Sequence, residues 1–109
     1  MIRISFRYDN TGCPTAFRCS GHAGYAARGR DIICASVSVL TINTVNSIEQ
    51  FTDDVFDLET DEKSGYMSFS LKEQPSDEAK LLMRSLELGI RGIIDDNGNR
   101  FITLVEWEV

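Results

Sequence analysis

The chain has 109 residues, the length of one ordinary domain, and its 42% of hydrophobic residues is enough to form a single core. Residues 1–50 contain five Arg against three acids, and residues 51–109 contain six basic residues against fourteen acids, so the two parts carry +2 and −8. The net charge of −6 argues against binding to a nucleic-acid backbone, whereas the acidic part could attract a basic peptide.

We expect one soluble, cytoplasmic domain over residues 1–109. The first residues alternate in polarity, and no window approaches the ~18 apolar residues that a membrane span requires. The cysteines are Cys13, Cys19 and Cys34, an odd number that is unlike the paired set of a secreted disulfide framework. The thiols are therefore expected to be reduced.

The N-terminal residues 2–20 are predicted to form a β-hairpin. Apolar side chains recur at every second position over residues 2–8, which is the period of a half-buried strand. Residues 9–12 have the sequence DNTG, which is typical of a turn, and residues 15–20 alternate again around Phe17. This hairpin leads directly to His22, so His22 is expected just beyond a strand end.

Residues 33–51 are predicted to form a helix, although their many β-branched side chains favour a strand. Nineteen residues without Gly or Pro are longer than a typical strand, and the apolar positions recur at helical spacing. The expected buried stripe consists of Ile33, Val37, Leu40, Thr44, Ile48 and Phe51.

A second strand pair is predicted over residues 55–59 and 66–71, on either side of an acidic turn. A helix then begins after Pro75 and Ser76, with two acids in the first turn, where the helix dipole favours negative charge. Its buried stripe consists of Leu82, Leu86, Ile90, Ile93 and Ile94. We expect this helix to end at residues 96–99.

Residues 101–109 are predicted to form a fifth strand, buried on both faces at its start. The element order is then ββαββαβ. The predicted fold class is α+β, with two helices packed on a largely antiparallel five-stranded sheet, because this arrangement buries both helical stripes.

The segment 20–38 contains the residues best suited to catalysis. The first of them is His22, the only histidine of the chain. Cys34 follows after a glycine-rich connection, near the expected start of the helix. A neighbouring imidazolium and the N-terminus of a helix both favour the thiolate, which is the nucleophilic form of cysteine. Free N–H groups of a first helical turn could also bind a developing oxyanion.

Two other side chains of this segment are expected to support that chemistry. Ser38 lies four residues after Cys34 and therefore shares its helix face. Asp31 can cap the helix N-terminus or hold His22 in one tautomer, and both roles remain open. The glycines permit positive φ but lack the spacing of a phosphate-binding loop.

The whole chain resembles the ribosomal-processing cysteine protease family, Prp. The resemblance rests on residues 21–38, GHAGYAARGRDIICASVS, which are similar to the family signature of Gly-His, a small-residue loop, Gly-x-Asp and Cys-Ala-x-x-Ser. Ser36 departs from the Ala or Gly common at its position, and on a helix it points away from Cys34.

The resemblance implies an enzyme that acts as a homodimer. From the residues themselves we expect no metal or other cofactor and no direct nucleic-acid or membrane partner. It implies Cys34 as the nucleophile and His22 as its base, with Asp31 and Ser38 in support. Its substrate would be the N-terminal extension of the twenty-seventh large-subunit ribosomal protein. The implied substrate loop includes Gly21, Gly24, Tyr25 and Gly29, and we expect residues 21–30 to close over the peptide.

Two hypotheses of other classes compete with this one. Cys13, Cys19, His22 and Cys34 could bind a structural zinc ion, although their spacing lacks the paired short knuckles of ordinary zinc sites. Alternatively, the six acids within residues 53–62 could hold a basic ribosomal protein during ribosome assembly, without catalysis.

Overall fold

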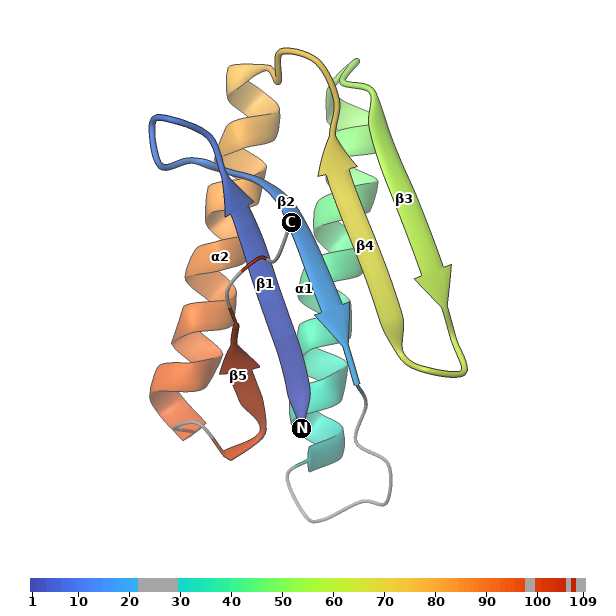
Figure 1. Ribbon diagram of the computed structural model, residues 1–109, viewed down its shortest axis with the longest axis vertical. Coiled ribbons are helices and arrows are strands. Elements are labelled where there is room, and N and C mark those ends of the chain that lie inside the picture. The colour runs from blue at the N-terminus through green and yellow to red at the C-terminus, as the bar shows by residue number, and fades with distance from the viewer. Residues whose placement is uncertain (22–29, 98–99, 106, 108–109) are drawn as a thin grey trace.

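The fold has two layers, a five-stranded sheet and two helices that cover one of its faces (Figure 1). The structure is a computed structural model that describes residues 1–21, 30–97, 100–105 and 107. The elements are β1 (Ile2–Tyr8), β2 (Pro14–Ser20), α1 (Arg30–Phe51), β3 (Phe56–Asp61), β4 (Tyr66–Leu71), α2 (Asp77–Asn97) and β5 (Ile102–Leu104). The predicted fold class and the order ββαββαβ are confirmed.

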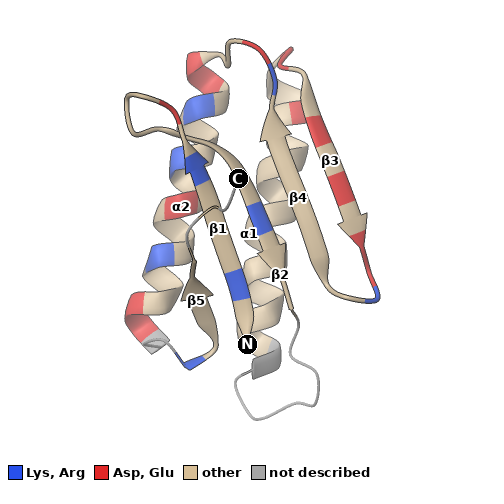
Figure 2. Ribbon diagram, in the orientation of Figure 1, with Lys and Arg blue, Asp and Glu red and all other residues tan. Residues whose placement is uncertain are grey.

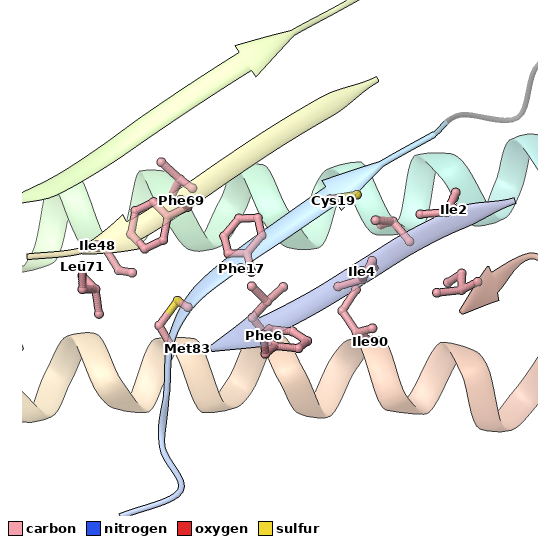
Figure 3. Close-up of a cluster of buried hydrophobic side chains, with 14 of the residues drawn as sticks. Ile2, Ile4, Phe6, Phe17, Cys19, Ile48, Phe69, Leu71, Met83 and Ile90 are labelled. Carbon is pink, nitrogen blue, oxygen red and sulfur yellow. The ribbon is translucent and has the colours of Figure 1, made fainter. Parts of the chain in front are cut away.

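The strands lie in the order β3-β4-β2-β1-β5, and only the β1–β5 pair is parallel. Paired residues of neighbouring strands point to the same face, so the row Phe6, Phe17, Phe69 and Leu58 crosses four strands on one side. The rings of Phe17 and Phe69 stack with centroids 5.5 Å apart, and both side chains are fully buried. Phe6, Phe17 and Phe69 belong to the core that faces the helices (Figure 3), whereas Leu58 on the edge strand is 43% exposed.

α1 is helical despite its β-branched composition, because its inner stripe packs against the sheet. Ile33, Val37 and Ile48 are buried there as predicted. The buried Thr41 hydroxyl donates to the Val37 carbonyl oxygen at 2.9 Å, and the buried Thr44 hydroxyl donates to the Leu40 carbonyl oxygen at 2.7 Å. Both hydroxyls therefore have a hydrogen-bond partner within the helix. Polar groups are thus accommodated on the inner face.

Two details of the predicted α1 are wrong. The helix begins at Arg30, three residues before the expected start, and its last residue, Phe51, is 77% exposed instead of buried. Ile48 is the last residue of α1 in the core, and Phe51 follows it by about one turn. The helix therefore extends beyond the part that packs against the core.

The hydropathy of α1 is higher than we expected from the sequence. Residues 32–51 reach a mean hydropathy of 1.4, and in length and composition they could cross a membrane, contrary to our expectation that no such window exists. Only 33% of that window is buried in the fold. α1 therefore presents apolar side chains on its outer face as well as to the core.

α2 begins and ends close to the predicted positions. The Ser76 hydroxyl accepts a hydrogen bond from the Ala79 N–H at 3.0 Å, which caps the helix. Leu86 and Ile90 are buried as predicted, and Ala79 and Met83 are buried as well. The other three predicted stripe residues, Leu82, Ile93 and Ile94, are partly buried against the same core.

The last strand is shorter than predicted: β5 covers three residues instead of residues 101–109. Ile102 is buried, and β5 pairs only with β1, at the edge of the sheet. The Val105 N–H still donates to the Ile4 carbonyl oxygen at 2.9 Å. Trp107 then lies on the helix-free face, with the guanidinium carbon of Arg18 3.9 Å from its ring centroid.

Candidate active site

A cleft of about 380 Å³ lies between the first half of α1 and the β3–β4 turn. α1 contributes Cys34, Val37, Ser38, Thr41 and Ile42. The hairpin contributes Thr60, Asp61, Glu62, Gly65, Tyr66 and Met67, and the N-terminal hairpin contributes Ile2, Cys19 and Gly21. The cleft therefore combines two thiols, apolar walls and a carboxylate pair.

Cys34 is the fifth residue of α1 and so lies in its second turn. The N–H groups without a partner inside a helix are those of its first residues, and the dipole acts mainly within the first turn. The expectation that Cys34 belongs to the first turn is wrong, because the helix starts earlier than its hydrophobic pattern indicates. The thiol is half-buried, packs against the core and opens to the cleft.

Ser38 lines the cleft beside Cys34, as their spacing of four residues predicts. Ser36 is turned to another side, where its hydroxyl donates to the Ile32 carbonyl oxygen at 2.8 Å. The expected separation of Ser36 from the thiol is thus confirmed.

Gly21 is the last described residue before His22, and it also lines the cleft. Its φ is +85°, and a Cβ at this position would lie 2.5 Å from the Met1 carbonyl oxygen. The backbone here requires glycine for both reasons. His22, Gly24, Tyr25, Gly29 and the side chain of Asp31 lie outside the described residues, as does the predicted closure over residues 21–30.

Cys19 is a cleft residue that the sequence reading did not assign to the site. It lies on β2, where its side chain is 9% exposed and faces the helices (Figure 3). Burial, together with the negative charge of a Cys34 thiolate, raises the pKa of its thiol to about 11. The signal in the sequence was the position of Cys19 on the same strand face as Phe17, two residues away.

Cys13 lies at the other end of β2 from Cys19. Its sulfur is 3.9 Å from the Lys80 carbonyl oxygen on α2, and the six-residue separation along a strand corresponds to roughly 20 Å. Zinc ligands must all lie about 2 Å from the ion. The proposed zinc site is therefore wrong, and the described residues contain no group of three His, Cys, Asp or Glu that could hold a metal ion.

Asp61 and Glu62 bring negative charge to the rim of the cleft. Asp61 is the last residue of β3, on which Asp57 and Glu59 are also acidic, and Glu62 begins the turn that follows. Arginines lie on β1 and β2 (Figure 2). The run of acids had suggested a basic partner, but the sequence did not show that part of the run faces Cys34 across a cleft. A thiol and carboxylates on opposite walls suit an extended peptide that carries positive charge.

Comparisons with known proteins agree with this arrangement. The family model described as cysteine protease Prp matches residues 1–102. The ribosomal processing cysteine protease Prp of Bacillus subtilis (strain 168) is 29% identical over 94 residues, which cover 86% of this chain and 81% of that protein.

Solved structures show the same fold. The essential ribosomal processing protease Prp of S. aureus in complex with a substrate peptide has a TM-score of 0.89 and 25% identity, covering 98% of this chain and 100% of that one. The S. aureus protease with a covalently linked product peptide has a TM-score of 0.86 and 26% identity over the same shares. A Streptococcus mutans protein is 33% identical with a TM-score of 0.85, covering 97% of this chain and 93% of that one. With a family model that matches almost the whole length and a thiol at an open cleft, the chain belongs to the cysteine protease Prp family.

Proposed function

We propose that this protease uses Cys34 as its nucleophile and His22 as general base to remove the N-terminal extension of the twenty-seventh large-subunit ribosomal protein. The observation that carries the proposal is the exposure of the thiols. Cys13 and Cys19 are buried, whereas Cys34 is half-buried and opens to the cleft. The structure of the S. aureus relative contains a covalently linked product peptide, which supports a route through a covalent intermediate.

The chemistry follows from these roles. The Cys34 thiolate attacks the carbonyl carbon of the scissile peptide bond, and His22 transfers a proton to the departing amine. The resulting thioester is hydrolysed by water, which regenerates the thiol. Ser38 lies beside the thiol on the same helix face and supports this geometry, and Asp31 serves as the helix cap or as the residue that orients His22.

The walls of the cleft support a peptide substrate of mixed character. Val37, Ile42 and Met67 offer apolar contacts near Cys34, and Asp61 and Glu62 offer charge contacts at the rim. Ribosomal proteins are basic because they bind RNA. An N-terminal extension with apolar and basic residues therefore fits both kinds of surface.

The deciding experiment compares cleavage of the extended ribosomal protein by wild type and by single variants. We expect Cys34→Ala and His22→Ala to abolish cleavage, and Cys34→Ser to be nearly inactive because a hydroxyl ionises far less readily than a thiol. The matched control is Cys13→Ala, which removes a buried thiol at the other end of β2. Near wild-type turnover by folded Cys34→Ala would contradict the proposal and favour a non-catalytic role in ribosome assembly.

We also propose that the protease is a homodimer and that the outer faces of its helices form the interface. Leu40 of α1 packs close to Gly89 of α2, and their neighbours Val39 and Leu88 are 66% and 75% exposed. Ile32 of α1 is exposed to a similar extent, at 70%. Such apolar surface is typical of a site of association.

Light scattering tests the dimer, because Val39→Glu should shift the mass to that of a monomer whereas Arg3→Glu, at an exposed position of β1 on the helix-free face of the sheet, should not. A wild-type monomer at assay concentration would contradict the proposed dimer.

The proposed substrate also implies that the enzyme acts in the cytoplasm, where ribosomal proteins are synthesised. Cell fractionation tests that assignment.

A further inference from the structure

Two thiols from different elements open to the same cleft. Cys19 is the last residue but one of β2, between Ile4 of β1 and Met67 of β4, and its side chain points toward the helices. Cys34 of α1 packs against the core cluster that contains Cys19, and both line the cleft. The sheet and the helix thus bring together two cysteines that are fifteen positions apart in the chain.

The two thiols differ in their access to solvent. Cys19 is 9% exposed, and its pKa of about 11 keeps it almost entirely protonated near neutral pH. Cys34 is the more exposed of the two. An oxidant that enters the cleft therefore reaches Cys34 more readily, while the less exposed Cys19 stays an unreacted thiol.

We propose that a hydroperoxide converts Cys34 and Cys19 into a reversible disulfide that switches the protease off. This inference rests on the proposed function, since it takes Cys34 to be the nucleophile. The disulfide removes the attacking sulfur from the cleft. It also protects that sulfur from irreversible oxidation to sulfinic or sulfonic acid.

The reaction balances with hydrogen peroxide as the oxidant. The Cys34 thiolate attacks one peroxide oxygen, the O–O bond breaks, and the sulfenic acid forms as the other oxygen leaves as hydroxide and takes up a proton to become water. The Cys19 thiol then attacks the sulfenic sulfur and gives up its proton to the departing hydroxide, so that the S–S bond forms and a second water leaves. Two thiols lose two electrons and two protons in all, and a dithiol reductant reverses the change.

Peptide mapping of the wild-type protein tests the cross-link without any assay of cleavage. Trypsin cuts after Arg18, Arg28 and Arg30, so Cys13, Cys19 and Cys34 end in three separate peptides. After treatment with hydrogen peroxide and alkylation, we expect the Cys19 and Cys34 peptides to be linked and the Cys13 peptide to be alkylated. Cys34 as sulfinic acid with Cys19 alkylated, or a cross-link that includes Cys13, would overturn the proposal.

Variants test whether the cross-link protects the enzyme. Peroxide should inactivate wild type and Cys13→Ala, and dithiothreitol should restore both to the untreated rate. Cys19→Ala should be inactivated with no recovery, because its Cys34 proceeds to the sulfinic acid. Full recovery of Cys19→Ala would contradict the protective role.

The two proposals fail in different ways. Cleavage by Cys34→Ala would show that Cys34 is not the nucleophile. The peptide map of the oxidised wild type would still report whether Cys19 and Cys34 form a disulfide. If instead Cys34→Ala is inactive and the oxidised wild type shows no Cys19–Cys34 link, only the switch is wrong.

Discussion

Gly21 is the position at which backbone geometry constrains the edge of the cleft most tightly. Its φ of +85° lies in the region that other residues rarely adopt, and the Met1 carbonyl oxygen leaves no space for a Cβ. Gly12 has almost the same φ, +84°, but a Cβ there would meet nothing within 4 Å. Both positions have a positive φ, but only Gly21 also lacks space for a side chain. A comparison of the two therefore separates the cost of backbone strain from the cost of steric overlap.

We predict that Gly12→Ala will lower the free energy of unfolding by about 1 kcal/mol, the cost of a positive φ alone. Gly21→Ala should cost more, about 2–3 kcal/mol, because Met1 must also move. Gly21→Ala should in addition reduce cleavage, since Ile2 lines the cleft next to Met1. Urea denaturation of both variants measures the difference, and equal losses of stability would show that Met1 yields without cost.

At the scale of elements, the start of α2 depends on the segment that follows α1. The Asp54 carboxylate accepts hydrogen bonds from the N–H of Ser76, at 2.8 Å, and from its hydroxyl, which in turn caps the helix. Burial acts to raise the pKa of Asp54, but the hydrogen bonds from Ser76 outweigh it and lower the pKa below its usual value. Asp54 thus contributes stability in its ionised form.

We predict that Asp54→Ala lowers the free energy of unfolding by about 1–2 kcal/mol at neutral pH, the range for a lost cap or charged hydrogen bond. Because the folded pKa is depressed, this contribution is present above the unfolded pKa and is lost as pH falls through the folded pKa. The difference between wild type and Asp54→Ala should therefore shrink in acid. Asp53→Ala, at an exposed neighbouring position, serves as the control. A difference that stays constant from pH 7 to acid would show that the charge of Asp54 is not involved.

At the scale of the whole molecule, the negative charge is concentrated on one side of the cleft. The β3 strand and the following turn carry acids, whereas the arginines of the sheet lie on β1 and β2 (Figure 2). Only Asp61 and Glu62 of these acids line the cleft. Asp57 is 3.2 Å from the Lys72 ammonium, with both side chains exposed.

We predict that the double variant Asp61→Asn, Glu62→Gln raises KM for a basic substrate peptide by about fivefold, since two exposed charge pairs contribute up to about 0.5 kcal/mol each. The change in kcat should be small, because these carboxylates contact the substrate away from the scissile bond. Added salt should raise KM for wild type more than for the double variant. Asp57→Asn is the control on the same strand and should leave KM unchanged. A double variant with wild-type KM would mean that the rim acids do not contact the peptide.

Much of the fold could be predicted because its signals are local. Alternation over residues 2–8 and 66–71 identified β1 and β4, and the length of residues 33–51 correctly outweighed their preference for strands. The errors concern the ends of elements, where the pattern of apolar residues does not indicate the boundary. Arg30 is helical although the apolar stripe starts at Ile33, and β5 ends at Leu104, before Trp107 packs against Arg18 on the helix-free face.

The sequence by itself determined the element order, the helix faces and the identity of Cys34 as the thiol to examine, because periodicity and motif spacing are properties of short segments. Only the tertiary structure decided that β5 pairs in parallel with β1, that Asp61 and Glu62 face α1 across a cleft, and that Cys19 rather than Cys13 lies near Cys34. These contacts join residues far apart in the chain, and their geometry follows from how the helices pack on the sheet. No pattern within one segment records that packing.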